Sequence, residues 1–187
     1  MNRKFVMGVA GMPGSGKATV KSMAEGMGYP VVVMGDEIRG EARLRRLQLT
    51  PENVGKIMLQ LREEEGLAAI AKRCIPKIES THSEIVFVDG VRSLAEVNEF
   101  KKHFHNFTVI AVHSSPEMRF QRLCKRKRSD DPQGWDVFNQ RDLRELRVGQ
   151  GNVIAVSDYM IVNEGTYEEF KVKVQQVLEA SIPKWTK

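Results

Sequence analysis

The sequence predicts a three-layer α/β fold with a five-stranded parallel sheet. Short apolar stretches alternate with stretches of helical periodicity along the 187 residues, and this alternation places helices on both faces of a parallel sheet. A glycine-rich segment follows the first apolar stretch directly. Because ligands of such folds bind beyond the carboxyl ends of the strands, the residues that follow each strand are the candidates for function.

The predicted elements follow from local sequence patterns. Strands are short apolar runs, and helices begin at residue types that cap them, with Asp36, Thr50 and Ser93 at expected caps. Two helices before the third strand are more than one crossover needs, which predicts a helical insertion. The expected strands are 4–10, 31–34, 84–88, 107–113 and 159–162, and the expected helices are 17–27, 37–46, 51–64, 66–80, 94–103, 116–127, 136–147 and 167–180.

The composition indicates an ordinary globular protein, with 41% hydrophobic and 28% charged residues. No apolar run approaches the ~20 residues that span a bilayer, and the first apolar run is too short for a signal peptide, so we expect a cytoplasmic protein without a membrane partner. Cys74 and Cys124 have no metal-type spacing and are expected to be buried free thiols. The net charge of +5 permits a nucleic-acid partner without arguing for one.

The segment from Gly11 to Thr19 indicates nucleotide phosphate binding. It fits three of the four fixed positions of the pattern G-x-x-x-x-G-K-[ST], with Ala18 where Ser or Thr is expected. Glycines let backbone N–H groups point at phosphate oxygens, the following helix adds its positive end, and Lys17 adds a cation. The alternative is a glycine-rich turn without a ligand. The candidate residues are Gly11, Met12, Pro13, Gly14, Ser15, Gly16, Lys17, Ala18 and Thr19.

Charged residues follow two further strands. Asp89 ends the apolar run 85–88, where a carboxylate holds Mg²⁺ beside a phosphate loop, directly or through water; the alternative is a turn residue. Arg39 and Arg92 also follow strand ends, and guanidinium groups suit bidentate phosphate binding, which predicts a second phosphate site. The alternative is surface arginines paired with Glu37, Glu41 or Glu96.

A basic stretch precedes a polar loop in the second half of the chain. Aromatic residues do not alternate with these charges beyond Phe120, so the pattern that stacks single-stranded nucleic acid is missing. A closing flap fits better, because its arginines would offset negative charge on a transferring phosphoryl group and exclude water. The alternative is a solvated basic face. The basic residues are Arg119, Arg122, Lys125, Arg126, Lys127 and Arg128, and Arg141, Arg144 and Arg147 follow at helical spacing.

These motifs resemble those of adenylate kinases and dephospho-CoA kinases. The loop resembles the adenylate-kinase pattern G-x-P-G-x-G-K-G-T, and G-D-x-x-R at 35–39 resembles the start of that family's acceptor-binding helix. D-G-V-R at 89–92 resembles its D-G-[FY]-P-R segment shortened by one residue, and R-S-D-D at 128–131 resembles the R-x-D-D of its lid. The stretch 155–165 resembles the A-D-Y-V-I-x-N-x-G end of dephospho-CoA kinases. Over nearly its full length the chain resembles an archaeal group of P-loop proteins related to both families.

The resemblance implies a P-loop NTPase fold like that of nucleoside-monophosphate kinases, with ATP and Mg²⁺ as cofactors. It implies a single domain with its core at 1–34, 81–127 and 148–187, an acceptor-binding helical insertion at 35–80 and a short lid at 128–147. Adenylate-kinase loops carry a glycine at the position of Ala18, so Thr19 is the hydroxyl expected near the metal.

The resemblance also implies roles for single residues. Lys17 would hold the β and γ phosphates, and Asn163 and Gly165 would lie near the adenine. For a hydroxyl acceptor, Asp36 is the candidate carboxylate beside the acceptor; its alternative is a purely capping role. The remaining assignments are Arg39 and Arg92 to the acceptor, Arg128 and Arg141 to the phosphoryl group, and Asp89 to Mg²⁺.

The predicted function is transfer of the ATP γ-phosphoryl group to a small phosphate-bearing or nucleotide-like acceptor, either a nucleoside monophosphate or dephospho-CoA. Two alternatives stay open. One is an ATPase with a regulatory or assembly role and no small acceptor, and the other is a nucleic-acid-associated ATPase.

Overall fold

The computed structural model describes residues 4–126 and 131–182, and its centre is a five-stranded sheet in which all neighbouring strands are parallel. The strand order is β2-β3-β1-β4-β5. This confirms the predicted sheet. The strands are β1 (Phe5–Ala10), β2 (Val31–Val33), β3 (Ile85–Asp89), β4 (Asn106–His113) and β5 (Tyr159–Val162).

The helices agree with the sequence prediction with one addition. The short α8 was not predicted; Gly149, at φ 111°, ends α7 and begins α8 because glycine adopts the left-handed conformation without strain. The helices are α1 (Lys17–Gly26), α2 (Met34–Leu44), α3 (Pro51–Glu65), α4 (Ala69–Ser80), α5 (Leu94–His103), α6 (Pro116–Arg126), α7 (Trp135–Val148), α8 (Gln150–Ala155) and α9 (Tyr167–Ser181).

The predicted caps have different outcomes. The Thr50 and Ser93 side chains accept hydrogen bonds from the third residues of their helices, as predicted. The prediction for Asp36 is wrong, because α2 begins at Met34 directly after β2 and Asp36 lies within the first helical turn. A negatively charged residue there still stabilises the helix by interacting with the positive end of the helix dipole.

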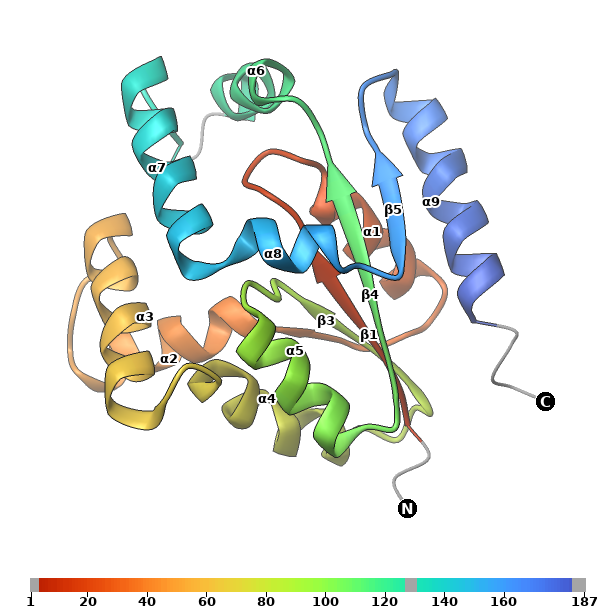
Figure 1. The fold of residues 1–187 in the computed structure, drawn as a ribbon, viewed down its shortest axis with the longest axis horizontal. Coiled ribbons are helices and arrows are strands. Elements are labelled where there is room, and N and C mark those ends of the chain that lie inside the picture. Colours follow the sequence, from red (N-terminus) through yellow and green to blue (C-terminus); the bar gives the residue numbers. More distant parts are fainter. Residues whose placement is uncertain (1–3, 127–130, 183–187) are drawn as a thin grey trace.

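The sheet separates two hydrophobic clusters, which makes the fold three-layered. Alternate residues of β1 face opposite layers, with Val6 in one cluster and Met7 in the other. The first cluster contains side chains of α2, α3, α4, α5 and α8, and the second contains side chains of α1 and α9. Figure 1 shows α9 along one side of the sheet, and α6 beyond the arrowhead of β4. Every residue of β1 is buried, as expected for a central parallel strand.

The strand register places functional candidates at one edge. Val9 of β1 lies opposite Asp89 of β3, and Val33 of β2 lies on the other side of Asp89. The loop after β1 (residues 11–16, called the phosphate loop below), the start of α2 and the loop after Asp89 therefore leave the sheet side by side.

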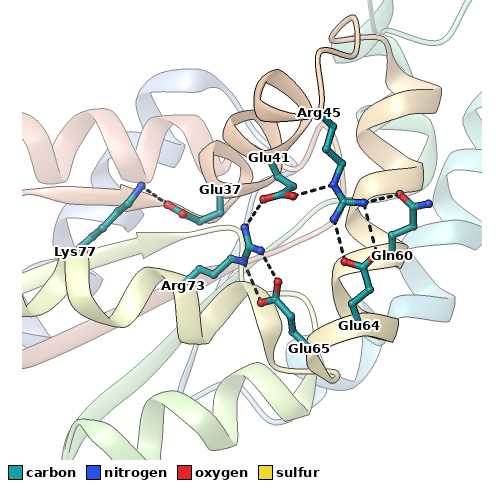
Figure 2. Close-up of polar contacts among 8 residues, drawn as sticks. All are labelled: Glu37, Glu41, Arg45, Gln60, Glu64, Glu65, Arg73 and Lys77. Atoms are coloured by element: carbon teal, nitrogen blue, oxygen red, sulfur yellow. Dashed lines mark hydrogen bonds and ion pairs between the residues drawn. The ribbon is translucent and has the colours of Figure 1, made fainter.

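Ion pairs join α2, α3 and α4 (Figure 2). Glu41 on α2 accepts hydrogen bonds from Arg73 on α4 and from Arg45, both at 2.8 Å, and these bonds lower the pKa of Glu41. Arg45 also pairs with Glu64 on α3 at 2.9 Å, and Arg73 pairs with Glu65 on the same helix. A single exposed ion pair contributes little to stability, but a shared network restrains all three helices together.

Two further features concern the cysteines and membrane association. Cys74 is buried as predicted, whereas the prediction for Cys124 is wrong, because this residue of α6 is exposed. None of the helices in the described ranges combines the length and apolar character that crossing a bilayer requires.

Candidate active site

The loop after β1 has a backbone that requires glycine at three positions. Gly11, Gly14 and Gly16 have φ values of 150°, 82° and 111°, which side chains of other residues rarely allow. A Cβ atom at Gly14 would lie 2.7 Å from the backbone oxygen of Arg119, and one at Gly16 would lie 2.5 Å from Nδ2 of Asn163. The loop is thus packed tightly against the segments that follow β4 and β5.

Lys17 begins α1 and folds back over this loop. Its Nζ donates to the backbone oxygens of Gly11 (2.5 Å) and Met12 (3.3 Å). Burial lowers the pKa of Lys17 to about 8, and the carboxylate of Asp89 partly opposes this by raising it. Three other charged groups act on the same pKa, namely Arg92, Glu145 and Arg141. Charged groups of β3, the loop after it and α7 therefore influence the protonation of Lys17.

Asp89 has the properties expected of a metal-facing carboxylate. Its Oδ1 is buried and has no hydrogen-bond partner within the described residues, and the same holds for Oγ of Ser15 in the loop. A buried polar atom without a protein partner is usually satisfied by a water, an ion or a ligand. The described residues contain no group of three or more His, Cys, Asp or Glu that could hold a metal unaided. This donor set fits Mg²⁺, which keeps several waters and takes phosphate oxygens as ligands.

Arg92 lies between α3 and α7. Its Nη1 lies 3.2 Å from Oε1 of Glu145 on α7 and 3.6 Å from Sδ of Met58 on α3. Its backbone N–H donates to Oε2 of Glu96 (2.8 Å), and Glu96, fully buried, also accepts from Arg62 of α3 (2.6 Å). Glu96 therefore fixes the backbone of Arg92 by a hydrogen bond, while the Arg92 side chain forms an ion pair with α7.

Asp36 and Arg39 of α2 pair with each other. Oδ1 of Asp36 accepts from Nε of Arg39 at 3.1 Å, and the pair is exposed. Asp36 also lines a groove of about 490 Å³ between α2 and α4. The acceptor roles of Asp36 and Arg39 stay predictions.

The helix α7 faces α3 across the site. Nη1 of Arg144 lies 3.9 Å from the place that a Cβ at Gly55 would take. Arg141 is half-buried, and its charge acts on the pKa of Lys17. Its role at the phosphoryl group stays a prediction. Arg128, the other predicted lid arginine, lies outside the described residues.

A cavity of about 260 Å³ lies beside the loop. Thr19 and Gly165 line it together with the ring of Tyr167. Asn163 supports the loop as well as lining this cavity: its Nδ2 donates to the backbone oxygen of Ser15 (2.8 Å), and its Oδ1 accepts from Arg122 (3.2 Å). The positions near the adenine predicted for Asn163 and Gly165 and the metal role predicted for Thr19 stay predictions.

The arginines of α6 are held by protein groups. Arg119 pairs with Asp142, Arg122 with the backbone oxygen of Asn163, and Arg126 with Asp131. The arginines whose charges act on the pKa of Lys17 are instead Arg92 and Arg141.

Sequence reasoning missed the role of Glu145. This glutamate follows Arg141 by four residues, so both side chains lie on one face of α7. That spacing is the signal that could have placed Glu145 beside the phosphate loop together with Arg141.

Comparison with known proteins agrees with this geometry. A family model for an AAA domain matches residues 10–139. The fold is shared with the structure of TT1252 from Thermus thermophilus (TM-score 0.62, 18% identity, 96% of this chain and 98% of that chain). It is also shared with a shikimate kinase from Acinetobacter baumannii in complex with shikimate (TM-score 0.59, 19% identity, 100% and 97%). The chain thus contains an AAA-type domain and has the fold that these two structures share.

Relatives of similar length are found in archaea. The chain is 50% identical over 175 residues to the UPF0200 protein of Hyperthermus butylicus, covering 94% of both chains. It is 46% identical over 180 residues to the UPF0200 protein of Thermococcus kodakarensis, covering 94% of this chain and 97% of that one. The chain belongs to the UPF0200 family.

Proposed function

We propose that this protein is an ATP-dependent phosphotransferase that moves the γ-phosphoryl group of Mg·ATP to a small nucleotide-like acceptor. The observation that carries the proposal is the glycine-dependent loop after β1, which leaves the sheet beside Asp89, whose buried Oδ1 has no partner within the described residues. Charges from three separate elements, those of Asp89, Arg92, Glu145 and Arg141, also act on the pKa of Lys17, which directly follows this loop. Arginines after β3 and on α7 favour phosphoryl transfer over nucleotide binding alone, because guanidinium groups offset negative charge on a transferring phosphoryl group.

Each group has a role in the proposal. The loop N–H groups and Lys17 bind the phosphates, and the cavity beside Tyr167 takes the base. Mg²⁺, held through Asp89, would neutralise charge on the β and γ phosphates. Arg92 and Arg141 then stabilise the negative charge on the transferring group, so that catalysis consists of positioning and charge stabilisation.

The acceptor is proposed to enter between α3 and α7. In this proposal residues 35–80 bind the acceptor and residues 128–147 form the lid that closes over it. Arg92 lies between these segments and is the candidate acceptor ligand. A nucleoside monophosphate or dephospho-CoA fits, because either brings a phosphate to an arginine.

The test is a screen for phosphoryl transfer from Mg·ATP. The acceptors are the nucleoside monophosphates and dephospho-CoA, with shikimate as a hydroxyl compound bound by one structural neighbour. ATP consumption that depends on one acceptor, and that Lys17→Ala abolishes, supports the proposal. Hydrolysis unaffected by every small acceptor but stimulated by RNA or by a protein would overturn it in favour of an ATPase role.

A further inference from the structure

Arg119 is a buried charge near the start of α6. Its side chain is 4% exposed, and a buried guanidinium must be paired. Nη1 lies 2.8 Å from Oδ1 of Asp142 on α7, and Nη2 completes a two-bond contact with the same carboxylate. The guanidinium carbon also lies 4.9 Å from the ring centre of Phe138 on α7. Arg119 is therefore anchored to α7.

The same guanidinium holds the phosphate loop. Nη1 donates to the backbone oxygen of Pro13 (3.2 Å), and Nε donates to the backbone oxygen of Ser114 (3.1 Å). Gly14 packs against the backbone of Arg119, where a Cβ would find no room. One planar group thus joins the loop after β1, the loop after β4 and α7. Lysine cannot reproduce this, because its single nitrogen lacks the fixed fork.

We propose that Arg119 is a positioning residue that couples the phosphate loop to α7. A movement of α7 displaces the carboxylate of Asp142, and the guanidinium transmits this displacement to the carbonyl of Pro13. Because α7 also carries Arg141 and Glu145, the positions of these charges and the shape of the loop change together. The coupling itself needs no ligand, and its consequence for ATP rests on the proposed function.

Hydrogen exchange of the protein without ATP tests the coupling directly. Asp142→Asn keeps the size of the side chain and removes its charge. We expect faster exchange of the loop amides 11–19 in this variant, although Asp142 is distant in sequence. Arg73→Lys is the matched control, since it alters an Arg–Glu network of the α2–α4 helices (Figure 2). Loop exchange unchanged in Asp142→Asn, or equally raised in Arg73→Lys, would overturn the inference.

Binding of Mg·ATP gives the second measurement. Arg119→Lys and Asp142→Asn should each weaken binding about tenfold, since each removes charge-assisted hydrogen bonds. The double variant should bind about as weakly as either single variant, because both break one linkage. Additive losses would mean that the two residues act separately and would overturn the inference. Absence of binding by the unaltered protein would refute the proposed function and leave the exchange result to decide the coupling.

Mg·ATP should also protect the amides of α7, residues 135–148, in the unaltered protein. In Arg119→Lys saturated with Mg·ATP this protection should be lost. If Arg119 had a purely structural role, Arg119→Lys would lower the unfolding temperature, but Mg·ATP bound at the loop would still protect the amides of α7. Full protection of α7 in the saturated variant would contradict the coupling.

Discussion

Lys17 should make the protein without nucleotide less stable at pH 7 than at higher pH. Burial lowers the pKa of Lys17 from 10.5 to about 8. Between these two values the unfolded chain holds a proton on this amine that the folded protein lacks. The free energy of unfolding therefore rises with pH through this window, and the full penalty is present below about pH 8.

The lowered pKa corresponds to about 3 kcal/mol of destabilisation at pH 7. The two hydrogen bonds from Nζ to backbone oxygens offset part of this, at about 1 kcal/mol each. Lys17→Met removes both effects. We expect it to raise the free energy of unfolding by about 1–2 kcal/mol at pH 7, and we expect this gain to vanish or reverse near pH 10.

Urea unfolding followed by circular dichroism at pH 7 and pH 10 measures both quantities. Lys21→Met is the control, because Lys21 lies on the same helix, and its exposed ion pair with Glu25 is long, at 3.7 Å. It should change stability little at either pH. If Lys17→Met shifts stability equally at both pH values, the buried amine is not the source of the effect.

Three further predictions concern the loop, the metal and the buried ion pair. Asp89→Asn should weaken binding of Mg·ATP about tenfold or more while leaving binding of ATP in EDTA nearly unchanged, as measured by calorimetry. Gly14→Ala should destabilise by about 2 kcal/mol in urea unfolding, because its φ is 82° and a Cβ would meet backbone; Gly26→Ala, which meets nothing within 4 Å, should stabilise by up to about 1 kcal/mol. Glu96→Gln should destabilise by about 3 kcal/mol, because Arg62 would remain buried without its carboxylate.

Each prediction has a contradicting result. Equal losses with and without Mg²⁺ would remove Asp89 from the metal site. A Gly14→Ala protein as stable as Gly26→Ala would mean that the loop adapts easily. A Glu96→Gln change below about 1 kcal/mol would show that the amide replaces the carboxylate.

The sheet, most helices and the phosphate loop could be predicted because their signals are local. Apolar runs, capping residues and glycine spacing act within a few residues, and β1, the Ser93 cap and the loop follow from them. The short α8 escaped prediction because it depends on the single left-handed Gly149. Asp36 was misread as a cap because capping patterns locate a helix start only to within a turn, and α2 begins directly at the end of β2.

The arrangement of the site depends on contacts that no local pattern encodes. Nδ2 of Asn163 reaches the backbone oxygen of Ser15 across 148 positions, and Arg119 reaches Pro13 across 106. Both residues contact the phosphate loop from segments that follow other strands, β5 and β4. Local chemistry was sufficient to predict a loop of the phosphate-binding type and the alternation of strands and helices. Only the tertiary structure showed which charges act on Lys17 and that Arg119 of α6 pairs with Asp142 of α7. These contacts join residues far apart in the sequence, because a buried charge must find a partner wherever the fold provides one.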